Sequence, residues 1–319
     1  MLVPPSKGFA LSVNTHNVAL DALTEWIEGC ITFVDSTLSR SDILDVLLEE
    51  NIYVNQDFAK MRVDDAWAEL NRRKKCLGEH CTFAVHGARV NRTQPWTEAP
   101  AYAFCLLLSL QVSYRPAFTE IFGRDYMEQG ILFERLTAAA MQFTGWKTHS
   151  TGWSKVAANS IRDKVEALAA HLGEPSRPGA IESWTDAFAK DGGLDVVCHF
   201  PFEDGWPGRP LLYVQCASGE NWKEKRPTPN LALWTKLLDL ATAPTRGIAI
   251  PFVLLADDFR KAANCDFLSL LLDRHRLSAP SPTAEKGWLS NELAKDLNKW
   301  TKGRLPALYS QTSGMPSFA

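Results

Sequence analysis

The chain has 319 residues, of which 45% are hydrophobic and 22% charged, and its formal net charge is −3. This length is enough to bury a sizeable core and favours a division into two units. The slight negative charge argues against a protein that coats nucleic acid through a general excess of cations. It is compatible with a local basic cleft, because binding depends on where charges lie.

The first residues, MLVPPSKGFALSVN, lack the charged start and the continuous apolar core of a signal peptide. The longest apolar stretch, around AYAFCLLLSLQV, is shorter than the roughly 18 residues that span a bilayer. Seven scattered cysteines, an odd number, indicate reduced thiols rather than a disulfide framework. We therefore expect a cytoplasmic protein that does not enter a membrane.

Residues 1–120 predict a mostly helical domain. Ser39 with Asp42 three residues later is typical of a helix start, and Asn51 is typical of a helix end. The expected elements are helices over 39–51, 57–78 and 100–111, the last apolar on every side, and a short hairpin over 81–93. This order is compatible with a winged-helix DNA-binding module, but small helical domains share the pattern more often, and a module that docks a partner is the alternative.

Pro116 interrupts the periodicity between Ser113 and Phe122, and we place a linker there. The second domain would then cover residues 121–319. Its expected elements, in chain order, are a helix over 129–143, a short strand over 145–153, a helix over 155–173, strands over 194–200 and 210–216, a broken helix over 221–241, a buried strand over 246–258, and helices over 266–275 and 285–303. Without the inserted helix, residues 129–257 read α-β-β-β-α-β, so the fold class is α/β.

Three of these elements carry an acidic or amide side chain. Glu134 lies within the apolar helix, Asp195 within the first long strand and Gln215 at the end of the next. If the two strands pair, Asp195 and Gln215 can point at one ion at the end of the sheet, and the carbonyl of Cys216 can add a backbone ligand. Hard oxygen ligands suit Mg²⁺, which can polarise a phosphodiester and activate a water molecule.

Each residue also has a simpler interpretation. Glu134 could be a solvated helix charge, Asp195 a turn residue beyond a misplaced strand boundary, and Gln215 a capped strand end. An aspartate inside a strand is, however, disfavoured by propensity and costly to bury without a partner.

The set resembles the restriction-endonuclease-like nucleases, the PD-(D/E)XK superfamily. In that superfamily the helix glutamate often lies in a G-x-x-F-E-x-L context, and this chain has Gly130, Phe133, Glu134 and Leu136 at those positions. The resemblance covers residues 129–257, with Gln215 as in the glutamine-bearing variants.

This resemblance implies a Mg²⁺- or Mn²⁺-dependent endonuclease acting on DNA. Its metal ligands would be Glu134, Asp195, Gln215 and the carbonyl of Cys216. It also implies a place in restriction or phage defence, where a partner subunit could activate or restrain the enzyme.

The chain departs from the family pattern at the lysine. Two residues after Gln215 the pattern has a lysine, and this chain has Ala217. Lys223 or Lys225 on the following helix could reach into the space, and Lys223 is expected first because it lies nearer the helix start. The alternative is a catalytically inactive nuclease-fold subunit that binds DNA or a protein partner.

Two further patterns have plain interpretations. Cys76, Cys81, His80 and His86 could contribute to a zinc site, but Cys-x4-Cys matches no compact zinc motif and buried thiols are the expectation. The basic run 72–75 is expected on a solvated helix face, and it would contact phosphates if this domain docks on DNA.

Overall fold

The chain forms two compact units, seen here in a computed structural model that describes residues 1–5, 20–53, 55–124, 126–151, 161–183, 193–225, 227–267 and 269–312. Unit 1 combines residues 1–125, 251–253 and 285–319, and unit 2 combines residues 126–250 and 254–284. The change of unit at 125/126 lies close to the expected boundary at 120. The C-terminal segment, expected in the second domain, lies instead in unit 1.

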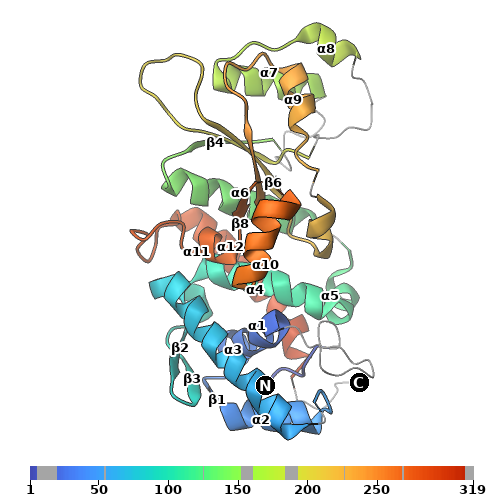
Figure 1. Ribbon diagram of the computed structural model, residues 1–319, viewed down its shortest axis with the longest axis vertical. Coiled ribbons are helices and arrows are strands. Elements are labelled where there is room, and N and C mark those ends of the chain that lie inside the picture. The colour runs from blue at the N-terminus through green and yellow to red at the C-terminus, as the bar shows by residue number, and fades with distance from the viewer. Residues whose placement is uncertain are drawn as a thin grey trace. The chain divides into compact units, whose positions relative to one another are not determined.

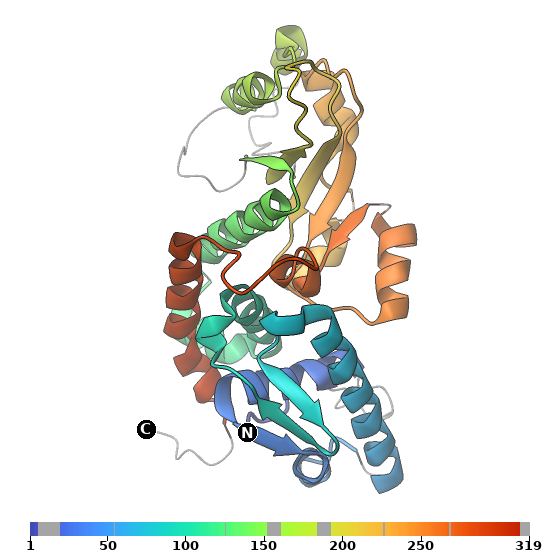
Figure 2. The same cartoon turned by 90° about the vertical axis from the view of Figure 1, so that its left-hand side faces the viewer.

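Unit 1 begins with a helix, a strand, two helices and a hairpin. These are α1 (Leu20–Gly29), β1 (Thr37–Ser39), α2 (Arg40–Glu49), α3 (Gln56–Leu77), β2 (Phe83–His86) and β3 (Arg89–Arg92), and a π-helix (Cys30–Val34) follows α1. The strands form an antiparallel sheet in the order β1-β3-β2, with the hairpin beside the first strand (Figure 2). The predicted helices and hairpin are confirmed, including the reciprocal capping of α2 by Ser39 and Asp42.

Unit 1 is completed by α4 (Pro100–Ser113), α5 (Arg115–Phe122) and α12 (Asn291–Tyr309). Every residue of α4 from 101 to 110 is buried, as predicted. The linker expected over 113–122 is wrong, because α5 occupies it. Pro116 lies in the first turn of α5, where a backbone N–H has no helical partner to lose. The rings of Phe104 on α4 and Trp300 on α12 meet edge to face with centroids 5.0 Å apart.

Unit 2 is a five-stranded mixed sheet with helices on both faces. Its elements are α6 (Met127–Phe143), β4 (Lys147–Ser150), α7 (Ile161–Leu172), α8 (Pro178–Ser183), β5 (Val196–His199), β6 (Leu211–Cys216), a 3₁₀ helix (Glu220–Lys225), α9 (Leu231–Leu237), β7 (Thr245–Ala249), α10 (Ala256–Lys261), a π-helix (Ala262–Phe267), β8 (Leu270–Leu272) and α11 (Arg274–Ser278). The order is β4-β5-β6-β7-β8; β4, β5 and β6 pair antiparallel, and β6, β7 and β8 pair parallel. The predicted α/β class is confirmed.

Three expected elements of unit 2 differ. The helix expected over 266–275 is wrong, because its apolar residues form β8 and the helix begins only after Asp273, whose side chain caps α11. The strand expected over 246–258 ends at Ala249, near Pro251, which has no N–H for a ladder. The segment 220–225 is a 3₁₀ helix rather than an α-helix, which changes the directions of its side chains.

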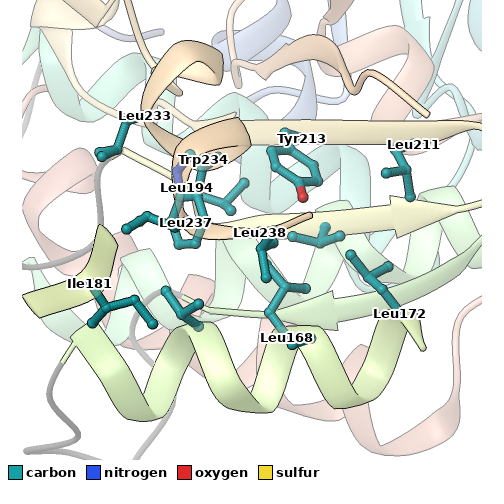
Figure 3. Close-up of a cluster of buried hydrophobic side chains, with 13 residues drawn as sticks. Leu168, Leu172, Ile181, Leu194, Leu211, Tyr213, Leu233, Trp234, Leu237 and Leu238 are labelled. Atoms are coloured by element: carbon teal, nitrogen blue, oxygen red, sulfur yellow. The ribbon is translucent and has the colours of Figure 1, made fainter. Parts of the chain in front are cut away.

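One face of the sheet carries the apolar core of unit 2. Val197 on β5 and Tyr213 on β6 are register partners, and both are buried against α7 and α9 (Figure 3). Figure 1 shows α7 and α9 on one side of β4 and α6 on the other. Alternation turns Cys216 away from the core face and toward α6, where its thiol bonds the Thr137 side chain. In the part of the chain described, no helix is long and apolar enough to cross a membrane.

Candidate functional site

The carboxylate of Asp195 is fixed at the end of β5 by its neighbours on β6. Its Oδ2 accepts a hydrogen bond from the backbone N–H of Cys216 at 2.6 Å and another from Nε2 of Gln215. Both side chains are buried, Asp195 at 5% and Gln215 at 6% exposure. Asp195 lies immediately before β5, which begins at Val196 rather than at the expected 194, and its backbone N–H bonds the Val214 carbonyl of β6 at 3.0 Å.

The pKa of the Cys216 thiol is influenced by two further charged groups, Glu134 and Lys225. Burial raises the pKa of the thiol well above its usual value, and the nearby negative charges of Asp195 and Glu134 raise it further. A hydrogen bond with Thr137 and the positive charge of Lys225 both lower the pKa of the thiol, but by less. The direct contacts are those of the Cys216 backbone with the Asp195 carboxylate and with the ammonium group of Lys225.

Glu134 reaches the site from α6. It is 3% exposed, so the interpretation as a solvated helix charge is wrong. The apolar neighbours Phe133 and Leu136 are buried beside it and hold this stretch of α6 within unit 2. A buried carboxylate on a helix requires compensating partners, which favours a functional role for Glu134.

Of the two candidate lysines, Lys225 contacts Cys216, whereas Lys223, the expected one, does not. The Nζ of Lys225 donates to the carbonyl oxygen of Cys216 at 3.3 Å. The Nζ of Lys223 lies over the ring of Trp222, 5.5 Å from its centroid, and the residue is exposed. The 3₁₀ turn thus directs Lys225, the later of the two, into the site.

Ala217 occupies the position of the family lysine. It is fully buried, and its N–H bonds the carbonyl of Ala249 on β7. This small residue stands beside the Cys216 carbonyl that Lys225 reaches from the following turn. A lysine from the following turn, Lys225, thus lies beside the position where the family pattern has its lysine.

Gly193 closes the opposite side of the site. Its φ is +71°, and a Cβ placed there would lie 2.6 Å from the Cβ of Thr228 and 2.9 Å from Oε1 of Gln215. Both the left-handed backbone and the lack of space require glycine. The close approach holds the Gln215 amide against Asp195.

The oxygen atoms at this place fit a hard divalent cation. Gln215 Nε2 lies 3.2 Å from the Cys216 carbonyl and also contacts Asp195, so the amide nitrogen points between two oxygen atoms. Rotating the amide by half a turn would place Oε1 there, giving three converging oxygen ligands, with the Glu134 carboxylate nearby. As the side chains stand, no three His, Cys, Asp or Glu side chains among the described residues form a metal-ligating group. The ligand set would thus depend on the amide and the backbone carbonyl.

The basic run 72–75 of α3 does not lie wholly on the solvated helix face expected for it. Arg73 is fully buried, where it pairs with Glu28 at 2.9 Å and with Glu69 at 2.9 Å, so it cannot contact a phosphate. Arg72 also pairs with Glu69. The exposed charged residues of α3 are Lys60, Lys75, Asp57 and Asp64, and Arg62, Asp65, Arg72 and Lys74 are half-buried. Arg62 pairs with Asp65, as Arg72 does with Glu69, so the solvent-facing side of α3 carries charges of both signs.

The alternative zinc site is not formed by the residues described. Cys81 is buried with the pKa of its thiol raised by burial to about 12, and Cys76 is exposed. The expectation of buried thiols is therefore confirmed for Cys81 and wrong for Cys76.

Sequence reasoning missed a second group of titratable side chains in unit 2. The rings of His149 on β4 and His171 on α7 have centroids 4.8 Å apart, and His171 and His199 on β5 are 5.0 Å apart. No local motif links these positions, so only the topology of the sheet could have revealed them.

Comparisons with known proteins add no assignment. No protein-family model matches the chain, and no curated protein matches it. A solved structure described as "Crystal structure of protein VC1899 from Vibrio cholerae" is similar at 10% identity over 83% of this chain and 82% of that chain, with a TM-score of 0.14. This similarity is too low to carry an argument about fold or function.

Proposed function

We propose that the chain is a metal-dependent nuclease that hydrolyses phosphodiester bonds in DNA through a site built on Glu134, Asp195, Gln215 and Lys225. The observation that carries the proposal is the convergence on Cys216. The N–H of Cys216 bonds the Asp195 carboxylate and its carbonyl oxygen accepts from Lys225, while burial and the charges of Asp195 and Glu134 raise the pKa of its thiol. The order α6, β4, β5, β6, α9, β7 supports a restriction-endonuclease-like core around these residues.

The roles follow from the chemistry of each group. Asp195 and Glu134 would hold Mg²⁺ or Mn²⁺ with the Gln215 amide oxygen and the Cys216 carbonyl. A bound divalent cation supplies charge stabilisation at the phosphoryl oxygen and lowers the pKa of a coordinated water. Lys225 would place its ammonium group beside the phosphate, where negative charge develops in the transition state.

The test is cleavage of plasmid and single-stranded DNA by the purified chain in Mg²⁺ or Mn²⁺, with a chelator as the blank. Wild type is compared with Asp195→Asn, which keeps shape and removes charge, and with Asp257→Asn, an exposed control on α10. The proposal expects metal-dependent cutting that is lost only in Asp195→Asn. Absence of cutting by wild type in both metals, with copurified partners present, would overturn it.

A second candidate is an inactive nuclease fold that serves as a binding subunit. Ala217 in place of the family lysine and the neutral Gln215 favour this candidate. Retained binding of DNA or of a protein partner, without cleavage in either metal, would select this candidate.

A further inference from the structure

The hairpin between β5 and β6 carries an unusual density of exposed aromatic rings. Phe200, Phe202 and Trp206 are 40%, 50% and 71% exposed, within seven residues of chain. Phe200 stands between Trp146 and Phe202, with ring centroids 5.9 Å and 6.0 Å away. Three exposed rings in one hairpin are costly to hydrate and indicate a binding surface rather than scattered surface residues.

Two cations lie at the base of this hairpin. Lys147 on β4 is the register partner of His199, the residue before Phe200. Arg209 precedes Pro210, whose carbonyl oxygen accepts a hydrogen bond from the N–H of Phe200 at 3.0 Å. The Nε of Arg209 donates to the Trp206 carbonyl oxygen at 3.1 Å. Within the described chain neither cation has an acidic partner, so both charges are available to an anion.

The three histidines form a cluster beneath these cations. Lys147, His149 and His199 share the face of the sheet that α7 covers, and His171 lies in the last turn of α7. Nε2 of His171 and Nδ1 of His199 are buried and have no hydrogen-bond partner among the residues described. His199 is 2% exposed, so this nitrogen is a buried polar group without a hydrogen-bond partner among the residues described.

The three histidines are neutral at neutral pH, and Lys147 and Arg209 carry the positive charge at this place. Burial lowers the pKa of all three histidines, that of His171 to about 4, and the charges of Lys147 and Arg209 lower the pKa of His171 and His199 further. Glu203 and Asp204 lie at the tip of the hairpin, and the carboxylate of Glu174 accepts a hydrogen bond from the N–H of Gly208, beside Arg209, at 3.4 Å. Lys147 and Arg209 are the charges that would draw an anion to the base of the hairpin, and the rings offer a stacking surface.

We propose that this hairpin surface, made of Trp146, Lys147, Phe200, Phe202, Trp206 and Arg209, binds single-stranded nucleic acid. Unpaired bases would stack on the rings and a phosphate would lie between Lys147 and Arg209 above the histidine cluster. Single strands expose the base faces that stacking needs, whereas a duplex hides them. The inference rests on the proposed nuclease function for its choice of ligand, and it names the substrate form.

The location suits a substrate site separate from the metal ligands. His199 is four residues after Asp195 on the same strand, so the two lie roughly 13 Å apart along the sheet. Figure 3 shows Leu211 and Leu172 at one end of the core and Leu194, beside Asp195, nearer the other. One strand of nucleic acid is long enough to contact both ends.

The test is fluorescence anisotropy with a labelled single-stranded DNA about 12 nucleotides long, a size within the range that such surfaces bind. A chelator is present throughout, so that cleavage cannot intervene. The full-length wild type is compared with Phe202→Ala/Trp206→Ala, whose rings are exposed enough to be removed without harm to the core, and with Lys147→Ala/Arg209→Ala. Lys236→Ala, an exposed lysine on α9, is the matched control.

We expect the aromatic variant to bind about tenfold more weakly or worse. The cationic variant should lower the slope of log affinity against log salt by about 0.7 for each phosphate that the protein no longer neutralises. Duplex DNA of the same sequence should bind more weakly than the single strand. Equal binding by all variants, no binding by wild type, or displacement by inorganic phosphate as efficiently as by the oligonucleotide would overturn the inference. Because the assay contains no metal, its outcome is separate from that of the cleavage test.

Discussion

The ammonium group of Lys225 donates to the carbonyl oxygen of Cys216 at 3.3 Å, nine residues back along the chain. The same Cys216 donates its N–H to the carboxylate of Asp195 at 2.6 Å. One peptide segment at the end of β6 thus joins the cation and an anion of the site. This relationship joins the proposed ligand Asp195 and Lys225 through the backbone of one residue.

Metal binding should depend on the two carboxylates together. Glu134→Gln and Asp195→Asn each remove one negative charge from the ligand set, so each should weaken Mn²⁺ binding at least tenfold, a loss of about 1.4 kcal/mol. Isothermal titration with Mn²⁺ measures this directly, and Asp257→Asn serves as the control. Unchanged Mn²⁺ affinity in both variants would exclude this ligand set.

Gly193→Ala should destabilise unit 2 more than an ordinary glycine substitution. Alanine there meets both a φ of +71° and the Thr228 side chain, for a cost of about 2–4 kcal/mol. Gly173→Ala, at φ +68° with open space, isolates the backbone cost of about 1 kcal/mol. The urea midpoints of the two variants should differ in that order, and equal midpoints would show that the site tolerates a Cβ at 193.

The histidine cluster should make the protein less stable in mild acid. The folded pKa of His171 is lowered from 6.5 to about 4, and those of His149 and His199 are also lowered. Below pH 6.5 the unfolded chain therefore binds more protons than the folded chain, and stability falls as the pH falls toward 4. His171→Gln should flatten the dependence of the urea midpoint on pH between 6.5 and 4. An identical pH dependence in wild type and variant would show that His171 does not titrate as described.

The buried ion network of unit 1 should be far more sensitive than a surface pair. Glu28→Ala leaves the fully buried Arg73 without one of its carboxylates, which should cost about 3–5 kcal/mol. Asp64→Ala removes an exposed partner of Arg40 and should cost less than about 1 kcal/mol. Thermal unfolding of both variants checks the contrast, and similar small losses would mean that Arg73 finds another partner.

Local patterns predicted most of the elements, because capping residues, alternation and apolar runs act over short distances. The capped start of α2 at Ser39, the buried α4, the strand that follows Asp195 and the strand that carries Gln215 were predicted in this way. The segment 266–275 failed, because a short apolar run fits a buried strand as well as a helix. Packing against β7 decided the outcome.

The parts of the site that escaped prediction depend on tertiary structure. Lys223 and Lys225 lie two residues apart in one helical segment, and only the 3₁₀ geometry decides which of them faces Cys216. The packing of α12 within unit 1 follows from its contacts with α4, nearly two hundred residues earlier. Neither feature can be predicted from the pattern of neighbouring residues in the sequence.

The most direct test of the proposed site compares Lys225→Ala with Lys223→Ala in Mg²⁺-dependent DNA cleavage. The two changes remove the same group two residues apart, so the comparison controls for charge and for folding. The geometry predicts a loss of about 10²–10³-fold in rate for Lys225→Ala, the range for removing one transition-state donor, and little change for Lys223→Ala. The reverse order, or equal rates in both variants, would contradict the placement of Lys225 in the site.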